Sequence, residues 1–299
     1  MDSQRLGGTL MGGRRICIVI PYFGVWPCWF GFFLKSCSHN PAIDWLFYTD
    51  CGEPPMTADN LRFVHCSFAE YKQKVSDTLG IHFDPHSAYK LCDIKPAYGL
   101  IHQQELAGYD FWGFGDVDVI YGDLQGYISD DMLRHNLVSF HGHRVGGHLC
   151  LLRNNALMRH AFQRCREWRA VFSDKNNHAF DERQFNALFM RHKNWPQWLR
   201  RLLYFPRRLM RTAYFRESYS TSFGSVPWLD GSFDFPAEWR WQAGRLTACN
   251  SDELTFPYLH FLHWKKHWPA DMVMQARPQD PVWYIRKDGI FTDSTAGQP

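Results

Sequence analysis

The stretch Tyr109-Asp-Phe-Trp-Gly-Phe-Gly-Asp-Val-Asp118 decides the fold class. Residues 109–115 are almost continuously apolar or small, which is typical of a strand buried on both faces in a parallel α/β sheet. Because residues i and i+2 of an extended chain point the same way, Asp116 and Asp118 can converge on one cation at the strand exit. Open α/β sheets bind ligands at this edge. A D-x-D triplet alone is more often a polar loop than a cation site, so the rest of the chain must decide between these two interpretations.

The segments around this strand predict alternating strands and helices. A strand at 15–21, a helix at 29–37 and a strand at 44–49 form the opening of a nucleotide-binding α/β half. A helix is expected over 90–104, with Pro96 as a kink or start. The later expected elements are strands at 137–141 and 148–153 and helices at 155–172 and 181–191.

The C-terminal part predicts two hairpins with a strand between them. Residues 239–248 and 282–292 each surround a glycine turn, and the second contains the favourable pair Asp288-Gly289. Between them, the apolar run FPYLHF carries His260. A strand from this distant part of the chain can bring an imidazole to the two aspartates, and mixed oxygen and nitrogen ligation suits Mn²⁺, with Mg²⁺ as the alternative.

Composition indicates one enzyme that stays inside the cell. A chain of 299 residues suits one large α/β domain with an accessory segment. The net charge of +3 does not favour nucleic acid as a partner. Nine cysteines without a C-x-x-C pair indicate reduced thiols, and neither a signal peptide nor a run of ~20 apolar residues is visible. The expected location is cytoplasmic.

Residues 191–216 differ from the rest in charge. They contain eight Lys or Arg and no acidic residue, interleaved with tryptophan, tyrosine and leucine. This pattern is typical of an interfacial helix that binds an anionic membrane surface from the cytoplasmic side. A solvated basic face whose aromatic residues pack on the domain explains the pattern equally well, and RNA is a weaker third interpretation.

Four segments together resemble a known family. The segment 114–124, FGDVDVIYGDL, resembles the D-x-D segment of GT-A glycosyltransferases, in particular the glycogenin and lipooligosaccharide galactosyltransferase group. Residues 146–154, GGHLCLLRN, resemble that group's acceptor-facing strand, and 181–186, DERQFN, resembles its D-Q-x-x-L-N helix start. Residues 260–268, HFLHWKKHW, resemble its H-x-x-G-x-x-K-P-W signature. The four segments occur in family order, which is more specific than any one of them.

The resemblance implies a GT-A type, Rossmann-like central sheet flanked by helices, with the basic aromatic segment and C-terminal hairpins added to it. The domain division that follows is 1–14 flexible N-terminus, 15–190 nucleotide-sugar-binding and catalytic α/β core, 191–235 accessory segment, 236–292 C-terminal part completing the site, and 293–299 flexible tail.

The resemblance also assigns roles to residues. Asp118 and His260 would ligate the metal, with Asp116 bound to it or bridging to the ribose. Lys266 would add positive charge at the leaving diphosphate. The candidates for holding the nucleotide sugar, most simply a UDP-sugar, are Pro21, Tyr22, Phe23, Gly24, Asp50, Lys90, Asp93, Lys95, Asp116 and Lys266. The candidates for contact with the acceptor are Gly146, Gly147, His148, His263 and Trp264.

Asp181 and Glu182 are the candidates for catalysis at the sugar. A carboxylate at this place either lies near the anomeric carbon of a retaining enzyme or acts as the base of an inverting one. An aspartate at a helix start is also an ordinary cap. The similarity of 260–268 to a signature of retaining enzymes favours retention, although His263 replaces the glycine and His267 the proline.

The expected function is therefore metal-dependent hexosyl transfer from a nucleotide sugar to a hydroxyl of a saccharide or lipid-linked acceptor, in bacterial capsule, O-antigen or lipooligosaccharide synthesis. A sugar nucleotidyltransferase would also use a cation between carboxylates, but the glycine-rich opening of such enzymes is absent after the first strand. A catalytically idle carbohydrate-binding relative is the third hypothesis. The presence of Asp116, Asp118, His260 and Lys266 together speaks against it.

Overall fold

A seven-stranded, mainly parallel sheet forms the centre of the protein. The computed structural model describes residues 13–190, 209–221, 226–249, 251–269 and 271–294. The central sheet has the order β3-β2-β1-β4-β7-β6-β8, in which β7 runs antiparallel to both of its neighbours and every other adjacent pair is parallel. Its strands are β1 (Ile16–Pro21), β2 (Ile43–Thr49), β3 (Leu61–His65), β4 (Phe111–Gly115), β6 (Leu137–Ser139), β7 (Leu149–Arg153) and β8 (Ala213–Phe215).

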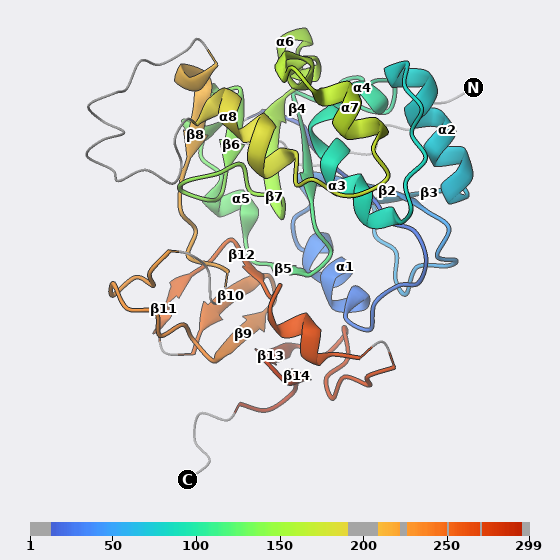
Figure 1. Cartoon of the computed structure of the whole chain (residues 1–299). Coiled ribbons are helices and arrows are strands. Elements are labelled where there is room, and N and C mark those ends of the chain that lie inside the picture. Colours follow the sequence, from blue (N-terminus) through green and yellow to red (C-terminus); the bar gives the residue numbers. More distant parts are fainter. Residues whose placement is uncertain (1–12, 191–208, 222–225, 250, 270, 295–299) are drawn as a thin grey trace.

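Short helices connect and cover these strands (Figure 1). The α-helices are α1 (Phe30–Ser38), α2 (Phe68–Leu79), α3 (Leu91–Ile94), α4 (Tyr98–Ile101), α5 (Leu124–Tyr127), α6 (Ala156–Arg159), α7 (Trp168–Ser173) and α8 (Asn186–Phe189). The 3₁₀ turns are η1 (Ala88–Lys90), η2 (Lys95–Ala97), η3 (Met132–Arg134), η4 (Ala161–Arg164), η6 (Met210–Thr212) and η7 (Trp264–His267), and η5 (Asp181–Phe185) is a π-helix.

The two faces of the central sheet follow from alternation along each strand. In β1, Ile16, Ile18 and Ile20 join the apolar cluster on the side of α1, whereas Cys17 and Val19 join the cluster on the opposite face. That opposite face is covered by α2, α3, α4 and α7. Because strand side chains point alternately to the two faces, an apolar run such as ICIVI buries its residues on both sides.

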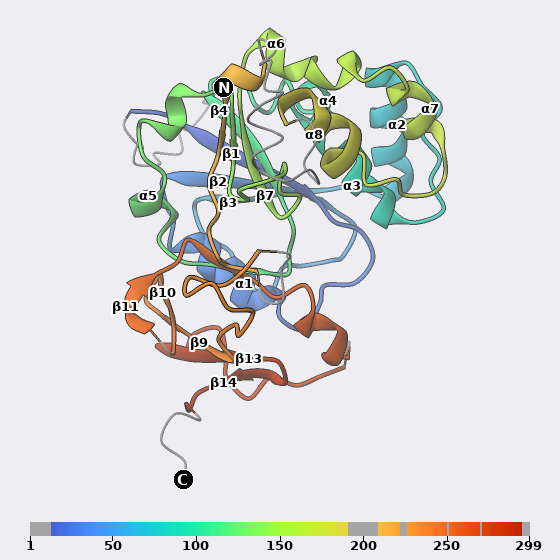
Figure 2. The ribbon, with the colours of Figure 1, turned by 60° about the vertical axis from the view of Figure 1, so that its left-hand side comes forward.

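A second, smaller sheet packs on the far side of α1. It has the order β11-β10-β9-β13-β14, with β9 (Glu238–Gln242), β10 (Arg245–Ala248), β11 (Ser251–Thr255), β13 (Val282–Arg286) and β14 (Gly289–Phe291). Figure 2 shows α1 between the two sheets. Phe30 and Phe33 of α1 pack toward the central sheet. Phe32 packs edge-on against Trp283, which stacks on Trp241 at 3.9 Å between ring centroids. Helix α1 thus joins both cores.

A two-stranded ribbon connects the two sheets at the edge where the central strands end. It pairs β5 (Val119–Tyr121) with β12 (Tyr258–His260) in antiparallel fashion. The indole N–H of Trp241 donates to the carbonyl of Tyr121 at 2.9 Å, which ties the ribbon to the second sheet. This pairing brings the D-x-D segment and the His260 strand together.

The predicted α/β class, with a mainly parallel Rossmann-like sheet flanked by helices, is confirmed. Both predicted C-terminal hairpins are present, as β9–β10 and β13–β14. The helix expected over 90–104 is broken at Pro96 as anticipated. Strand β3 and helix α2 were not predicted. Of the basic segment, residues 191–208 lie outside the described residues. No helix in the described ranges is long and apolar enough to cross a bilayer.

One helix prediction was wrong. Residues 155–172 form α6, η4 and α7 in place of one continuous helix. The backbone of Cys165 is extended (φ −77°, ψ 119°) and ends η4. This break lets Phe162 and Trp168 meet edge-on in the core, 5.0 Å apart between ring centroids. Core packing therefore overrides the helical pattern. The helix expected over 181–191 begins as the π-helix η5 and ends at Phe189.

Candidate functional site

Three side chains that are far apart in the sequence converge at the carboxyl edge of the central sheet. Asp116 and Asp118 lie between β4 and β5, and His260 ends β12. One potential ligand atom from each of the three lies within 4.8 Å of the others. Asp118 and His260 are buried, while Asp116 is partly exposed. The predicted metal ligands are thus brought together.

The strand pairing fixes the position of His260. Its backbone N–H donates to the Ser220 carbonyl at 2.7 Å, and its side-chain Nδ1 lies 3.3 Å from Thr221 Oγ1. The other ring nitrogen, Nε2, lies 3.6 Å from Asp118 Oδ2 and has no hydrogen-bond partner among the described residues. His260 Nε2 is thus buried and faces a carboxylate without a hydrogen bond, while Nδ1 lies beside a neighbouring side chain. This arrangement is typical of a histidine that binds a metal through one ring nitrogen.

A second histidine supports the first. The rings of His148 and His260 stack with centroids 4.3 Å apart. The hydroxyl of Tyr258 donates to the Phe140 carbonyl at 3.1 Å, so it accepts a hydrogen bond from His148 Nε2 at 2.8 Å. Burial, with the neighbouring His260 as a further cause, lowers the pKa of His148 well below its ordinary value. His148 is therefore a neutral packing partner of the candidate ligand.

Two lysines balance the charge of the aspartates. Lys95 is buried and donates to Asp116 Oδ1 and to the Gly147 carbonyl. The ammonium of Lys265 lies 2.7 Å from Asp118 Oδ2. Burial alone would raise the pKa of Asp118, but His260 and Lys265 together hold it below its ordinary value. Asp118 is therefore an anion that already attracts cations.

The donor set fits a divalent cation. Two carboxylates and one imidazole offer oxygen and nitrogen ligands of the kinds that Mn²⁺ takes, and Mg²⁺ accepts the oxygens. The buried, unbonded Nε2 of His260 is the observation that supports this fit, because an uncompensated buried polar atom is costly. The arrangement can hold one ion at the edge of the sheet, beside the loops that follow β1 and β2.

Asp181 lies next to the aspartate pair. It is 4% exposed and begins η5. A side-chain carbon added at Gly147 would lie 2.9 Å from Asp181 Oδ2 and 3.7 Å from Lys95 Nζ, so the glycine permits this close approach. Burial raises the pKa of Asp181 to about 7. Its neighbour Glu182 is half-buried and pairs with Arg144 at 3.1 Å. A carboxyl group that titrates near neutrality beside a cation site is suited to proton transfer.

The loops that follow β1 and β2 hold another group of predicted residues. Pro21 ends β1, and the Tyr22 N–H donates to a backbone carbonyl of β2 at 2.8 Å. Phe23 packs against the core below α2. The Gly24 N–H donates to the exposed Asp50 at 2.7 Å. All five residues lie at the same edge of the sheet as the aspartates.

Lys90 and Asp93 form a buried ion pair. Lys90 Nζ donates to Asp93 Oδ2 at 2.7 Å and to the carbonyls of Val171 and Asn176, both at 2.6 Å. Asp93 also accepts hydrogen bonds from two backbone N–H groups of the loop before η5. The buried pair therefore fixes the loop that leads to Asp181, and its polar atoms bond within the protein.

The residues of the C-terminal signature differ in burial and in position. Trp264 is buried in the core of the second sheet, and His263 lines a cavity beside the cluster. Lys266 is exposed, while Lys265 carries the ammonium that contacts Asp118. Sequence reasoning missed Lys265, although it is adjacent to the residue chosen. The turn after β12 directs Lys265 to the aspartate.

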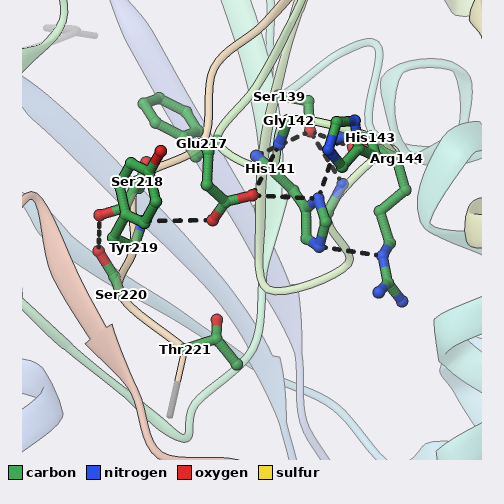
Figure 3. Close-up of polar contacts among 12 residues, drawn as sticks. Ser139, His141, Gly142, His143, Arg144, Glu217, Ser218, Tyr219, Ser220 and Thr221 are labelled. Carbon is green, nitrogen blue, oxygen red and sulfur yellow. Dashed lines mark hydrogen bonds and ion pairs between the residues drawn. The ribbon is translucent and has the colours of Figure 1, made fainter. Parts of the chain in front are cut away.

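A cavity next to His260 contains further residues that the sequence did not reveal. Glu217 is the central one, because it links the segment 141–144 to the segment 217–221 (Figure 3). Tyr219 and Thr221 follow it along the cavity wall. The sequence around Glu217 contains no recognised motif. The position of Glu217 depends on contacts between distant segments, namely the pairing of β8 with β6 and the approach of residue 221 to β12.

The fold and this cluster define an α/β protein with a candidate cation site at the carboxyl edge of its parallel strands. The chain belongs to the family of unknown function DUF6625, whose model matches residues 18–288. None of the curated proteins matches the sequence.

Two similar solved structures are those of transferases. Mouse xyloside xylosyltransferase 1 in its apo form has a TM-score of 0.35 and 10% identity, covering 64% of this chain and 90% of that one. The apo-form glycosyltransferase GlyE of Streptococcus pneumoniae TIGR4 has a TM-score of 0.35 and 9% identity, covering 60% and 44%. These scores and identities are too low to indicate a function.

Proposed function

We propose that the protein is a metal-dependent glycosyltransferase that moves a sugar from a nucleotide-sugar donor to a hydroxyl of a saccharide or lipid-linked acceptor. The observation that carries the proposal is the convergence of Asp116, Asp118 and His260 at the carboxyl edge of the sheet, with His260 Nε2 buried and without a bond among the described residues. A UDP-sugar is the donor that we propose, and Mn²⁺ or Mg²⁺ is the ion.

The residues divide the chemistry among them. Asp116, Asp118 and His260 would hold the ion, which when bound neutralises the diphosphate as the glycosidic bond breaks. Lys266 is exposed, whereas Lys265, whose ammonium lies 2.7 Å from Asp118 Oδ2, would offer its charge to the same diphosphate. Its bond to Asp118 keeps the ammonium at the cluster until an anion arrives.

Asp181 is the candidate for contact with the reacting sugar or acceptor. Its pKa of about 7 lets it exist in both protonation states near neutral pH. It either accepts the acceptor proton, as in an inverting enzyme, or stabilises the reacting carbon, as in a retaining one. Retention remains the prediction that the similarity of residues 260–268 favours. The anomeric configuration of the product, followed by NMR during turnover, decides between them.

The proposal is tested by offering UDP-, GDP- and CMP-sugars to the purified protein with and without Mn²⁺. We expect at least one UDP-sugar to raise the melting temperature and to be hydrolysed slowly, only when metal is present. Asp118→Ala should abolish both effects, whereas Asp77→Asn, an exposed aspartate on α2, should preserve them. Metal-independent stabilisation, or full donor binding by Asp118→Ala, would contradict the proposal.

A role in bacterial surface polysaccharide synthesis remains a prediction from the family resemblance, and a position at the inner face of the cytoplasmic membrane remains a prediction from residues 191–216. Neutralising basic residues of this segment should weaken binding to anionic liposomes, by about 1 kcal/mol for each charge near the surface. The residues to change are Arg200, Arg201, Arg207 and Arg208. Binding that is unchanged by all four substitutions would leave the solvated basic face as the explanation.

A further inference from the structure

A polar cavity adjoins the candidate cation site on the side of His260. Its volume is about 170 Å³, below the roughly 300–1,000 Å³ of pockets for drug-sized ligands, so it suits a single small ring. Among its lining residues, His260 belongs to the cation cluster and Glu182 adjoins Asp181. A molecule in this cavity would therefore lie directly beside the place where chemistry is proposed.

A chain of polar contacts shapes the wall of the cavity. Glu217 Oε2 accepts the Gly142 N–H at 2.9 Å and lies 3.4 Å from His141 Nδ1. Arg144 Nε donates to His141 Nε2 at 3.1 Å, and the same guanidinium pairs with Glu182 at 3.1 Å. Figure 3 shows Glu217 and Arg144 on opposite sides of the His141 ring. These polar contacts join three segments that are distant in sequence.

The contacts of His141 hold its ring in place between Arg144 and Glu217. Its Nε2 lies 3.1 Å from Arg144 Nε, and its Nδ1 lies 3.1 Å from the backbone nitrogen of His143 and 3.4 Å from Glu217 Oε2. An N–H donor therefore faces each ring nitrogen.

Fixed charge in the cavity wall is negative. Among the described lining residues, Glu182 and Glu217 are acids and Arg144 is the one guanidinium. Arg144 pairs with Glu182, and Glu217 adds a second carboxylate to the wall. As long as the cation site holds no ion, these carboxylates disfavour an anionic ligand, whereas hydroxyl groups can donate to the carboxylates and accept from the guanidinium.

The cavity also offers apolar surface. Tyr219 and Phe235 lie along its wall, with Leu262 at 37% exposure. Tyr219 has a positive φ of 53°, an unfavourable conformation for a tyrosine, and its N–H donates to Glu217 Oε1 at 3.2 Å. Backbone strain that is maintained by surrounding contacts is common at ligand sites. Ring faces next to hydroxyl-bonding groups are what a sugar requires.

We infer that this cavity binds the acceptor through one uncharged, hydroxyl-rich sugar ring, and that Glu217 discriminates against acidic sugars. The assignment to the acceptor rests on the proposed function, whereas the preference for a neutral sugar rests on the cavity alone. The location beside His260 places an acceptor hydroxyl next to the proposed donor. The selectivity is set by the charge of Glu217 rather than by cavity size, because a uronic acid and its parent hexose have nearly the same ring.

The experiment measures binding of simple glycosides to the whole protein by saturation-transfer NMR at pH 8 without added metal, because a cation at His260 would attract a uronate. The probes are methyl glycosides of glucose, galactose, mannose and N-acetylglucosamine, each neutral hexoside paired with its uronate. We expect at least one neutral glycoside to bind roughly tenfold more tightly than its uronate, the size of effect that one nearby charge produces. Glu217→Gln should reduce this ratio severalfold, and Glu167→Gln, an exposed acid before α7, should preserve it.

A second substitution guards against a folding defect, because Glu217 also joins two segments. Leu262 is partly exposed at the cavity, so Leu262→Lys should fold and should raise relative binding of the uronate, while Leu262→Glu should lower it. The inference would be overturned if uronates bound as tightly as neutral glycosides or more tightly, or if no glycoside bound. It would also be overturned if neither Leu262 substitution changed the ratio of neutral-glycoside to uronate affinity.

Donor binding is measured separately, as the metal-dependent melting shift with UDP-sugars. If that shift is absent but neutral glycosides bind selectively, the proposed function fails and the neutral-sugar site stands. If the shift is present but glycosides do not bind, the cavity inference fails and the proposed function stands.

Discussion

Replacing Asp181 with asparagine should make the protein more stable, and more so at higher pH. Asp181 is buried at the start of η5, beside Gly147 and Lys95. Asparagine has nearly the same shape and carries no charge to desolvate. Where a site is selected for chemistry rather than for folding, replacing its carboxylate is expected to raise stability.

The magnitude follows from the pKa of Asp181, which burial raises from 3.8 to about 7. Between pH 4 and 7 the unfolded chain has lost this proton while the folded protein retains it, so the free energy of unfolding falls as pH rises. At about 1.4 kcal/mol for each unit of pKa difference, the destabilisation reaches at most about 4 kcal/mol above pH 7. From pH 5 to pH 8, we expect the advantage of Asp181→Asn to grow by about 2–3 kcal/mol.

Urea unfolding followed by tryptophan fluorescence, at pH 5 and pH 8, measures this difference. Asp77→Asn on α2 is the matched control, because Asp77 is exposed and should change stability by little at either pH. The reasoning would be refuted if Asp181→Asn were less stable than the parent protein at pH 8. It would also be refuted if the advantage shrank as pH rose, because that sign belongs to a carboxylate stabilised in its ionised form.

Two further substitutions test the cluster. Lys265→Met should strengthen Mn²⁺ binding to the donor-free protein about five- to tenfold by calorimetry, because its ammonium no longer competes for Asp118, and should weaken UDP-sugar binding. Lys266→Met should have the smaller effect on both, and the reverse order would assign the diphosphate contact to Lys266. Gly147→Ala should lower the initial rate of transfer about tenfold to a hundredfold, since the added carbon displaces Asp181. An unchanged rate would show that Asp181 need not occupy its present position.

The sequence by itself indicated the fold class and the two aspartates. The last five residues of the apolar run 109–115 form β4, and ICIVI is most of β1, because a strand buried on both faces leaves a continuous apolar signature. The D-x-D segment follows at the strand exit, where spacing alone requires neighbouring carboxylates. His260 was found as well, through the resemblance of residues 260–268 to a known signature.

The broken helices show where local pattern fails. Residues 155–172 have a helical apolar period, but the core needs Phe162 and Trp168 in contact, and an extended Cys165 achieves this. Such a break is decided by partners that are distant in sequence. The π-helix at Asp181 is of the same kind, since it follows a loop that is fixed by Asp93.

The composition of the candidate site was decided by tertiary structure. Lys265 instead of Lys266 contacts Asp118, because a shift of one residue moves a side chain to a different side of the turn after β12. Glu217 reaches the cavity only through the pairing of β8 with β6. Local periodicity in a sequence reveals strands and candidate ligands. Burial and charge partners arise from contacts between segments far apart in the chain. These contacts set the pKa of Asp181 and the selectivity of the cavity.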